Sequence, residues 1–545
     1  MIKQWWHSAV VYQVYPRSFC DSSGDGNGDI RGIISKLDYL EKLAIDVIWL
    51  SPVYLSPMKD NGYDIADYQA IDPRFGNLDD MRELINSARQ RNIGIMMDLV
   101  LNHTSDQHAW FKQAQQSRQN PYREYYIWRD QPNEIASIFG GPAWQFDANT
   151  QQYYFHLFAD AQPDLNWENP NVAKEIQQMI SWWIEQGVAG FRLDVIDLIG
   201  KQIDQGITEN GPHLHPLLQN LHQACFANKQ LVTVGETWGA TPEIAKLYSD
   251  PARQELSMVF QFEHASIDWH PQYGKWQVQN FDLVALKKVL SKWQTAFNGD
   301  GWNALFWNNH DLPRIVSRWG NDQQYRRRSA KLFATLLHGM QGTPYIYQGE
   351  EIGMTNVRFE QLDDYDDIEI KSSYQEKVVE QQSLSHQQFM RGVYTSARDN
   401  ARTPMQWDSS NNAGFSQGQP WLALNPNYPE INVEKALNDQ HSVFYHYQQL
   451  IQLRKSSKYS DTMIYGKFSL LLAEHKQVFA YLRQHNAQSL LVVCNLSEQA
   501  TTISFDYEVD DVILNNLQQN SLQVMQLEQL NLAPYQALIY ALSSS

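Results

Sequence analysis

The sequence predicts an α/β fold: a (β/α)8 TIM barrel with a lid domain inserted after the third strand and a C-terminal antiparallel β domain. Three observations indicate this fold. Eight short apolar runs recur with helical patterns between them, and eight strands close such a barrel. The runs are hydrophobic almost throughout, as parallel strands covered by helices are. Several end near an acidic residue, and the carboxyl ends of parallel strands form the functional mouth of this fold.

The expected strands are bounded by turn residues and have the length of barrel strands. In chain order they are Val10–Tyr15, Val47–Leu50, Gly94–Val100, Gly190–Val195, Leu231–Glu236, Met258–Phe262, Asn303–Trp307 and Thr343–Tyr347. One helix between them is easy to recognise. Asn169 can cap it, Pro170 suits its first position, and Gly187 is placed to end it. Apolar residues follow at helical spacing, so this stretch predicts one helix–strand step of the barrel.

The spacing of the strands divides the chain into domains. The catalytic barrel is expected over residues 1–102 and 168–465, interrupted by an aromatic-rich and polar lid at 103–167. Long connections at the functional face are usually lids or small domains. A second insertion is expected at about 355–400, after the eighth strand, and short β-rich segments predict a C-terminal β-sandwich at 466–545.

Composition excludes several classes of function. The 545 residues are 43% hydrophobic and 19% charged, which is typical of a globular protein. The formal charge of −18 disfavours nucleic acid and anionic membranes as partners, because both bind basic surfaces. A neutral small molecule suits this charge, and we expect a monomer.

The cysteines and the N-terminus favour a cytoplasmic location. Cys20, Cys225 and Cys494 are far apart and form no metal-ligand spacing, so buried thiols are expected rather than disulfides. The first residues lack the pattern of a secretory signal, and no apolar run reaches about 18 residues.

Four segments place ionisable residues where strands should end. They are DLVLNHTS, GFRLDVID, VGETW and WNNHDLPR, which carry Asp98, Asp194, Glu236 and Asp311. Two carboxyl groups that flank one bond, with a third nearby, are the apparatus of a retaining glycosidase. We therefore predict a carbohydrate-cleaving enzyme, in which the Asp194 and Glu236 carboxyl groups lie about 5–5.5 Å apart.

These segments resemble the conserved regions of the α-amylase superfamily, glycoside hydrolase family 13. The resemblance covers almost the whole chain. Four further segments are similar to the branch that holds oligo-1,6-glucosidases and dextran glucosidases: QPDLNWENP, GETWGATPEIAK, FQFEH and ARDNARTPMQWD. The resemblance implies exo-acting hydrolysis of terminal α-1,6-glucosidic bonds in isomalto-oligosaccharides or dextran.

The resemblance also implies roles for the ionisable residues. Asp194 is the expected nucleophile, and Arg192, on the same face of its strand, would keep it ionised. Glu236 is the expected acid/base, which first protonates the leaving oxygen and then activates water. Asp311 would hold the distorted sugar through its hydroxyl groups. Asp98 is expected to organise the site rather than to contact substrate.

Further residues match the family's binding pocket for the terminal glucose. His103 and His310 are expected at the same sugar ring as the acids. Tyr63 would stack on that ring, while Asp60 and Arg398 would pair to close the end of the pocket, which implies removal of one glucose per event.

The remaining pocket residues concern its wall and the leaving sugar. Phe146 is expected in the pocket wall, and Trp238 is expected to stack on the next sugar. Lys275 could hydrogen-bond a neutral sugar or attract a phosphate. Val195, after the nucleophile, resembles enzymes that prefer α-1,6 bonds, although valine also suits a barrel strand.

The segment DSSGDGNGDIRG resembles the start of an EF-hand loop. Oxygen side chains stand at alternating positions: Asp21, Ser23, Asp25, Asn27 and Asp29. The usual glutamate at position 12 is replaced by Gly32. Because the family branch has a calcium loop here, we expect a structural Ca²⁺, with a metal-free polar turn as the alternative.

Other functions remain open. Trehalose-6-phosphate hydrolysis would need cationic groups at the leaving-sugar side, and an α-1,4-acting α-glucosidase would share the same acids. Sucrose isomerisation would need an Arg-rich loop after the fourth motif, where this chain has SRWGNDQQYRRRS, whose arginines are expected on a helix surface. A sugar-binding protein without activity would lack one of the acids, and all three are present.

Overall fold

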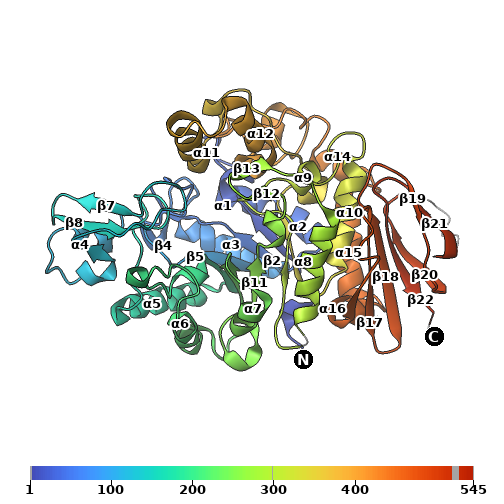
Figure 1. Cartoon of the computed structure of the whole chain (residues 1–545), viewed down its shortest axis with the longest axis horizontal. Coiled ribbons are helices and arrows are strands. Elements are labelled where there is room, and N and C mark those ends of the chain that lie inside the picture. The colour runs from blue at the N-terminus through green and yellow to red at the C-terminus, as the bar shows by residue number, and fades with distance from the viewer. Residues whose placement is uncertain (1–2, 298, 518–526, 544–545) are drawn as a thin grey trace.

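Eight parallel strands form a nearly closed barrel in the computed structural model, which describes residues 3–297, 299–517 and 527–543 (Figure 1). The strands pair in the order β11-β10-β9-β5-β2-β1-β15-β14, and one parallel bridge between Val259 and Asn303 joins the two outer strands. Their bounds are β1 Val11–Val14, β2 Val47–Leu50, β5 Gly94–Val100, β9 Gly190–Asp194, β10 Val232–Thr237, β11 Met258–Gln261, β14 Ala304–Leu305 and β15 Thr343–Tyr347.

All eight predicted strands are present. Four of them are shorter than expected, and the difference is largest in the seventh. The run Asn303–Trp307 keeps only two residues in the strand, β14, and the chain then bends toward Asp311. The continuous hydrophobicity has a structural cause, because both faces of each strand are buried. On β1, Val11 packs inside the barrel, whereas its neighbour Tyr12 packs against the surrounding helices.

Helices surround the barrel and cover its outer face (Figure 1). The helix predicted after Asn169 is confirmed as α5: the Asn169 side chain accepts from the Asn171 amide, and Gly187 ends the helix at a φ of 97°. The principal helices flanking the strands are α1 Ile30–Ser35, α2 Leu37–Leu43, α3 Leu78–Gln90, α5 Pro170–Gln186, α6 Leu214–Leu221, α7 Pro242–Ser249, α8 Leu283–Ala296, α9 Ile315–Arg318, α10 Arg326–His338, α15 Val443–Ser456 and α16 Ser460–Tyr465.

A small subdomain leaves the barrel between β5 and β9 (Figure 1, left). It contains α4 Ala109–Ala114 and a sheet in the order β6-β8-β7, formed by Trp128–Arg129, Gln152–Phe155 and Trp144–Asp147. Its apolar side chains, including Phe155 and Leu157, pack in one cluster with Val195 and Leu198. The insertion therefore rests on the segment that follows β9.

Two further excursions lie over the same end of the barrel (Figure 1, top). One is the hairpin of β12 Trp269–His270 and β13 Gly274–Val278, and the other carries α11 Ile368–Tyr374 and α12 His386–Ser396. Trp276 of the hairpin stacks on Phe389 of α12. The hairpin and the second insertion thus pack as one cover.

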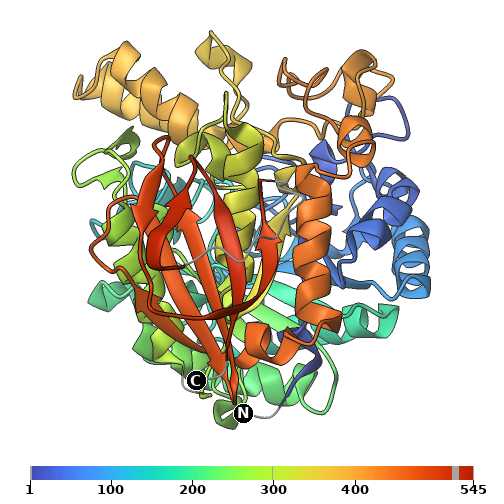
Figure 2. The ribbon, with the colours of Figure 1, turned by 90° about the vertical axis from the view of Figure 1, so that its right-hand side faces the viewer.

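The C-terminal part is an antiparallel sheet in the order β16-β17-β18-β22-β20 (Figure 2). One face packs on helix α10, where the Tyr481 hydroxyl donates to the Leu336 carbonyl. The other face packs on the small sheet β19-β21. The bounds are β16 Lys467–Leu471, β17 Val478–His485, β18 Gln488–Asn495, β19 Thr501–Ile503, β20 Val509–Asn515, β21 Leu530–Leu532 and β22 Ala537–Leu542.

Two general expectations can be compared with the described residues. Cys20, Cys225 and Cys494 are buried free thiols, as predicted. Among the helices of the described residues, none combines the length and apolar character that crossing a bilayer requires.

Candidate active site

A cavity of about 670 Å³ opens among the loops at the carboxyl ends of the strands. The three predicted acids and most of the predicted binding residues line it: Asp60, Tyr63, His103, Asp194, Glu236, Trp238, Lys275, Asp311 and Arg398. They come from segments between residues 60 and 398, so folding brings together groups that are distant in sequence. The pocket is the size expected for a small ligand.

Arg192 lies beneath the pocket and joins three carboxyl groups. Its Nη1 donates to Asp194 Oδ1 at 2.6 Å and to Asp98 Oδ1 at 2.8 Å, and its Nη2 donates to Glu236 Oε2 at 2.5 Å. The arginine is 1% exposed. A buried guanidinium therefore holds Asp194 and Glu236 side by side on neighbouring nitrogens.

The charge balance of this cluster controls its protonation. Burial and the two neighbouring carboxylates raise the pKa of Asp194 well above its ordinary value, while Arg192 opposes the rise. Burial likewise raises the pKa of Asp98, against the same arginine. Three carboxyl groups around one guanidinium carry excess negative charge, so the cluster retains a proton to higher pH than a free carboxyl group does. That proton belongs to the coupled cluster.

Val195 joins the end of β9 to Glu236 through the backbone. It has a φ of 35°, a left-handed conformation that is a genuine outlier for a β-branched residue. In this conformation its amide donates to Glu236 Oε2 at 3.0 Å. Such backbone strain costs on the order of 1–3 kcal/mol and concentrates at functional sites.

Asp311 also lines the pocket and is held by two arginines and His310. Its Oδ1 accepts from Arg402 Nη2 at 2.8 Å, and its Oδ2 lies 3.0 Å from His310 Nε2. Burial alone would raise the pKa of Asp311, but His310, Arg398 and Arg402 hold it well below its usual range. Asp311 is therefore held as a carboxylate.

The aromatic and histidine residues predicted at the sugar ring lie together. Tyr63 stacks on His310 with ring centroids 5.1 Å apart, and its hydroxyl donates to Asp98 Oδ2 at 3.0 Å. Asp98 thus lies below the pocket as an organiser, bound also to Arg192. His103 Nε2 lies 3.1 Å from the Tyr63 carbonyl oxygen.

Arg398 lines the pocket and is surrounded by carboxylates. Asp367 binds it at 2.5 Å through Nη2, while Asp60 and Asp311 each lie 3.5 Å from its guanidinium. Burial would raise the pKa of Asp367, but Arg398 brings it down to about 2. The predicted Asp60–Arg398 pair is therefore present at long range, and Asp367 is the principal anchor of the arginine.

Trp238 and Lys275 also line the pocket, and Phe262 packs behind Trp238. Trp238 stacks on Phe262 at 4.0 Å, remains 40% exposed, and donates from Nε1 to Glu236 Oε1 at 3.1 Å. Lys275 Nζ lies 2.5 Å from Glu369 Oε2, so its charge is paired within the protein. Trp238 is therefore beside Glu236. Lys275 is instead on the Arg398 side of the pocket, because its partner Glu369 also lies 3.4 Å from Arg398 Nε.

The prediction for Phe146 is wrong. It lies on β7, is 43% exposed, packs against Tyr153, and does not line the pocket. The aromatic wall is formed by Phe139 and Phe158, whose rings lie 5.4 Å apart. Phe146 and its neighbour Gln145 are both exposed on β7, whereas the two wall residues lie in irregular loops of the insertion.

Three site residues were not identified from the sequence. Gln162 donates to Asp60 Oδ2 at 3.2 Å, Arg402 binds Asp311, and Asp367 anchors Arg398. The motifs QPDLNWENP and ARDNARTPMQWD contain two of them, so the motifs indicated the segments but not these side chains. The acidic run QLDDYDDIEI contains the third, with nothing to single it out.

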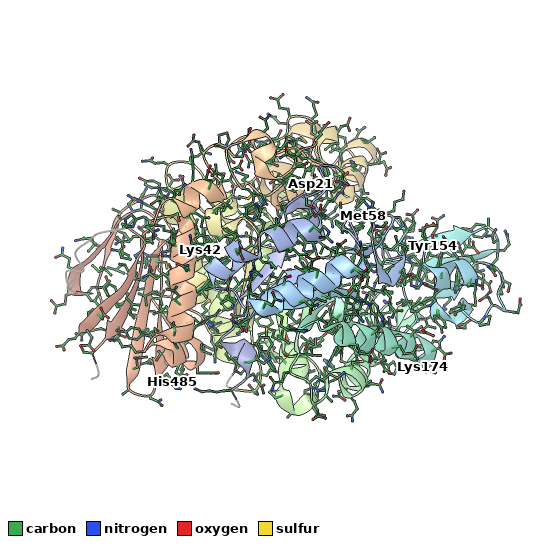
Figure 3. All side chains as sticks on the ribbon, turned by 180° about the vertical axis from the view of Figure 1, so that it is seen from behind. Asp21, Lys42, Met58, Tyr154, Lys174 and His485 are labelled. Atoms are coloured by element: carbon green, nitrogen blue, oxygen red, sulfur yellow. The ribbon has the colours of Figure 1, made fainter. Side chains whose placement is uncertain are left out.

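The predicted calcium loop lies apart from the pocket lining, on the N-terminal loop where Figure 3 labels Asp21. Asp21 Oδ1 and Asp29 Oδ2 both accept from the Ser23 amide, at 2.9 and 3.2 Å, so two buried carboxylates face one point. No lysine or arginine of the described chain pairs with Asp21, Asp25 or Asp29.

A calcium ion would need ligands besides carboxylates in this loop. Across the described residues, no group of three His, Cys, Asp or Glu side chains is arranged to hold a metal. The Ser23 hydroxyl and backbone carbonyls would have to complete a hard-oxygen set. Asn27 is less suited, because its side-chain oxygen accepts from Arg17 Nε at 3.0 Å. Carboxylate and hydroxyl oxygens are the ligands of a hard cation. Amides and hydroxyls already donate to Asp21 and Asp29, so a bound ion would replace some of these hydrogen bonds.

Arg192 binds the Asp194 and Glu236 carboxyl groups, and a pocket large enough for a sugar lies above them at the mouth of the barrel. This arrangement is typical of a glycoside hydrolase. Models of known families agree with this class. The alpha amylase catalytic domain matches residues 13–465, and the maltogenic amylase C-terminal domain matches residues 468–539. The chain belongs to the α-amylase family, glycoside hydrolase family 13.

Individual relatives are similar over their whole length. The chain is 55% identical to the glucan 1,6-alpha-glucosidase of Streptococcus pneumoniae serotype 4, covering 98% of this chain and 99% of the relative. It is 49% identical to the oligo-1,6-glucosidase of Bacillus cereus, covering 99% and 100%.

Solved structures share the architecture at lower identity. The trehalose-6-phosphate hydrolase of Bacillus licheniformis superposes with a TM-score of 0.94 at 43% identity, over 99% of this chain and 100% of that chain. An isomaltulose synthase from Klebsiella sp. LX3 gives a TM-score of 0.96 at 39% identity, with the same coverage.

Proposed function

We propose that this glycoside hydrolase is an exo-acting α-glucosidase that releases glucose from the terminal α-1,6 bonds of isomalto-oligosaccharides and dextran, with retention of configuration. The observation that carries the proposal is the shared contact of Asp194 and Glu236 with Arg192, below a pocket that Arg398 also lines. The proposed closure of one end by Arg398 leaves room for one terminal sugar, so the bond that follows it is the bond cleaved.

The proposed reaction has two steps. Asp194 attacks the anomeric carbon while Glu236 gives its proton to the leaving oxygen, and the sugar becomes covalently attached to Asp194. Glu236, now ionised, takes a proton from water, which attacks the same carbon and releases glucose. Asp311, held as a carboxylate, accepts hydrogen bonds from the ring hydroxyls as positive charge develops on the sugar.

Preference for the α-1,6 linkage rests on two observations. Relatives that cover nearly the whole chain at 49% to 55% identity are named for α-1,6 action. Val195 lines the pocket beside Glu236, where its side chain offers no hydroxyl to the leaving sugar.

A product time course tests the proposal. Isomaltotetraose should yield glucose and isomaltotriose first, with the α-anomer of glucose formed initially, and panose should yield glucose and maltose. Maltose should be cleaved slowly, and the Val195→Thr variant should raise the rate on maltose relative to isomaltose. Isomaltose as the first product of isomaltotetraose would contradict exo-action, and initial β-glucose would contradict retention.

Trehalose-6-phosphate hydrolysis is disfavoured by the pairing of Lys275. The ammonium that would attract the phosphate is neutralised by Glu369 at 2.5 Å, and Glu376 also lines the cavity. Sucrose isomerisation is disfavoured because the RRR run lies at the start of α10, outside the pocket lining. Including trehalose 6-phosphate and sucrose in the time course tests both alternatives.

The loop around Asp21 is proposed to hold a structural Ca²⁺. The ion would neutralise the two buried carboxylates and fix the loop at the start of α1. Chelation with EGTA should lower the thermal midpoint by about 2–5 °C, since an ion bound only to the folded state stabilises it. Added calcium should restore the midpoint, and the Asp21→Asn variant should no longer respond. A midpoint that EGTA leaves unchanged would contradict the proposal.

Location and assembly are also proposed. Three buried free thiols suit a reducing compartment, so the protein is proposed to be cytoplasmic. The acids and binding residues named above all belong to one chain, and a monomer is proposed as the active unit. Light scattering during size-exclusion chromatography would contradict the monomer if the mass were twice 63.3 kDa or more.

A further inference from the structure

Lys201 is a buried cation that the proposed reaction does not use. It follows the nucleophile strand, and its side chain is 3% exposed. Its Nζ lies 3.0 Å from Asp164 Oδ2 in the insertion and donates to Asn102 Oδ1 at 2.6 Å. A buried ammonium requires such partners, because an unpaired charge away from water is strongly unfavourable.

This contact fixes which way the Asn102 amide points. An ammonium has hydrogens to donate and no lone pair, so the Asn102 atom facing it must be the oxygen. The nitrogen, Nδ2, then lies 3.1 Å from His103 Nδ1. An amide nitrogen can only donate, and His103 Nδ1 must therefore accept.

The second ring nitrogen of His103 leads to the same conclusion. Nε2 lies 3.1 Å from the Tyr63 carbonyl oxygen, which can only accept, so Nε2 must carry the hydrogen. The ring is neutral because Nδ1 accepts a hydrogen bond. Burial also lowers the pKa of His103, against the opposing charges of Asp164 and Asp60. A neutral ring with its hydrogen on Nε2 satisfies both contacts.

A competing contact favours the other tautomer of His103, so the choice between the two tautomers depends on Lys201. Gln162 Nε2 lies 3.1 Å from His103 Nε2, and its amide is oriented by the Ala159 backbone N–H, which donates to Oε1. This second donor favours the opposite tautomer, with Nε2 as acceptor. Without Lys201, Asn102 could turn its oxygen toward Nδ1, and that tautomer would satisfy both amides.

We propose that Lys201 is a positioning residue for substrate: by holding the Asn102 oxygen, it keeps His103 in the Nε2–H tautomer, whose hydrogen bond to the Tyr63 carbonyl oxygen positions Tyr63 at the terminal sugar. The proposal rests on the proposed function for the identity of the sugar. It extends that function by assigning a role to a residue outside the pocket lining. Lys201 also links the insertion, through Asp164, to the same histidine.

Three variants separate this role from simple structural support. Lys201→Met removes the donor, Lys201→Arg keeps a donor-only cation, and Asn102→Asp places acceptor oxygens on both sides while retaining Lys201. Nitrogen NMR of histidine-labelled protein, with the His103 signals identified from a His103→Gln variant, reports which ring nitrogen carries the hydrogen. This measurement requires no substrate.

The proposal expects the hydrogen on Nε2 in the wild type and in Lys201→Arg, and on Nδ1 in Lys201→Met and Asn102→Asp. The last two variants should raise the KM for isomaltose about tenfold, as loss of one hydrogen bond does, with a smaller change in kcat. Lys174→Met is the matched control, because Lys174 lies exposed on α5 (Figure 3), and it should change neither quantity.

Two outcomes would overturn the proposal. One is an Nε2–H ring in folded Lys201→Met, since Lys201 would then not select the tautomer. The other is a changed tautomer with unchanged KM, since the tautomer would then not matter for binding. Failure of the enzyme to cleave isomaltose at all would refute the proposed function but leave the tautomer measurement interpretable.

Discussion

Asp194→Asn should lower kcat for isomaltose by at least about 10⁴-fold, because the amide cannot form the covalent bond to the sugar that the two-step reaction requires. Asparagine has nearly the same shape, and Arg192 can still donate to its oxygen. The thermal midpoint should therefore stay close to that of the wild type, which separates lost chemistry from lost folding.

The rate should be measured with glucose detection over long incubations, and the midpoint by calorimetry. Asp506→Asn is a matched control, since Asp506 is an exposed aspartate of the C-terminal part, and it should retain full activity. Turnover of Asp194→Asn within tenfold of the wild type would show that another group attacks the sugar.

Glu236→Gln should lower the rate on isomaltose by about 10³–10⁴-fold, the range expected for loss of general acid–base catalysis. The effect should depend on the leaving group. 4-Nitrophenyl α-glucoside has a leaving group that departs without a proton, so its first step should be much less affected. The second step lacks the base, and the glycosyl-enzyme should accumulate as a burst of nitrophenol.

Azide should restore turnover of this variant, because it attacks the glycosyl-enzyme without needing a base. The product should be α-glucosyl azide, which is formed with retention. Glu185→Gln, an exposed change on α5, is the control and should behave as the wild type. Equal losses on both substrates, with no azide effect, would rule out Glu236 as the acid/base.

Much of the fold was predictable because each barrel strand is buried on both faces. This burial leaves a continuous apolar run, which the sequence shows directly, and the motifs at the strand ends then place Asp194 and Glu236 together. The shortened strand β14 was not predictable in length, since residues such as Phe306 and Trp307 remain buried after the strand has ended.

The parts of the site that were missed depend on contacts between distant loops. Asp367 is one of several acids in its segment, and only its contact with Arg398 distinguishes it. The role of Phe146 was assigned wrongly because an aromatic residue in an insertion gives no indication of the direction in which its ring points. The contact of Lys201 with Asn102 spans 99 positions and has no local signature.

The ion pairs around Arg398 determine when the pocket can form during folding. The arginine's partners Asp60, Asp311 and Asp367 belong to three loops spread over more than half of the chain. Closing such long loops is entropically unfavourable until the intervening structure has formed. The proposed binding site for the terminal glucose is therefore completed only after nearly all of the barrel has been synthesised and folded. A growing chain on the ribosome lacks this site until its last third emerges.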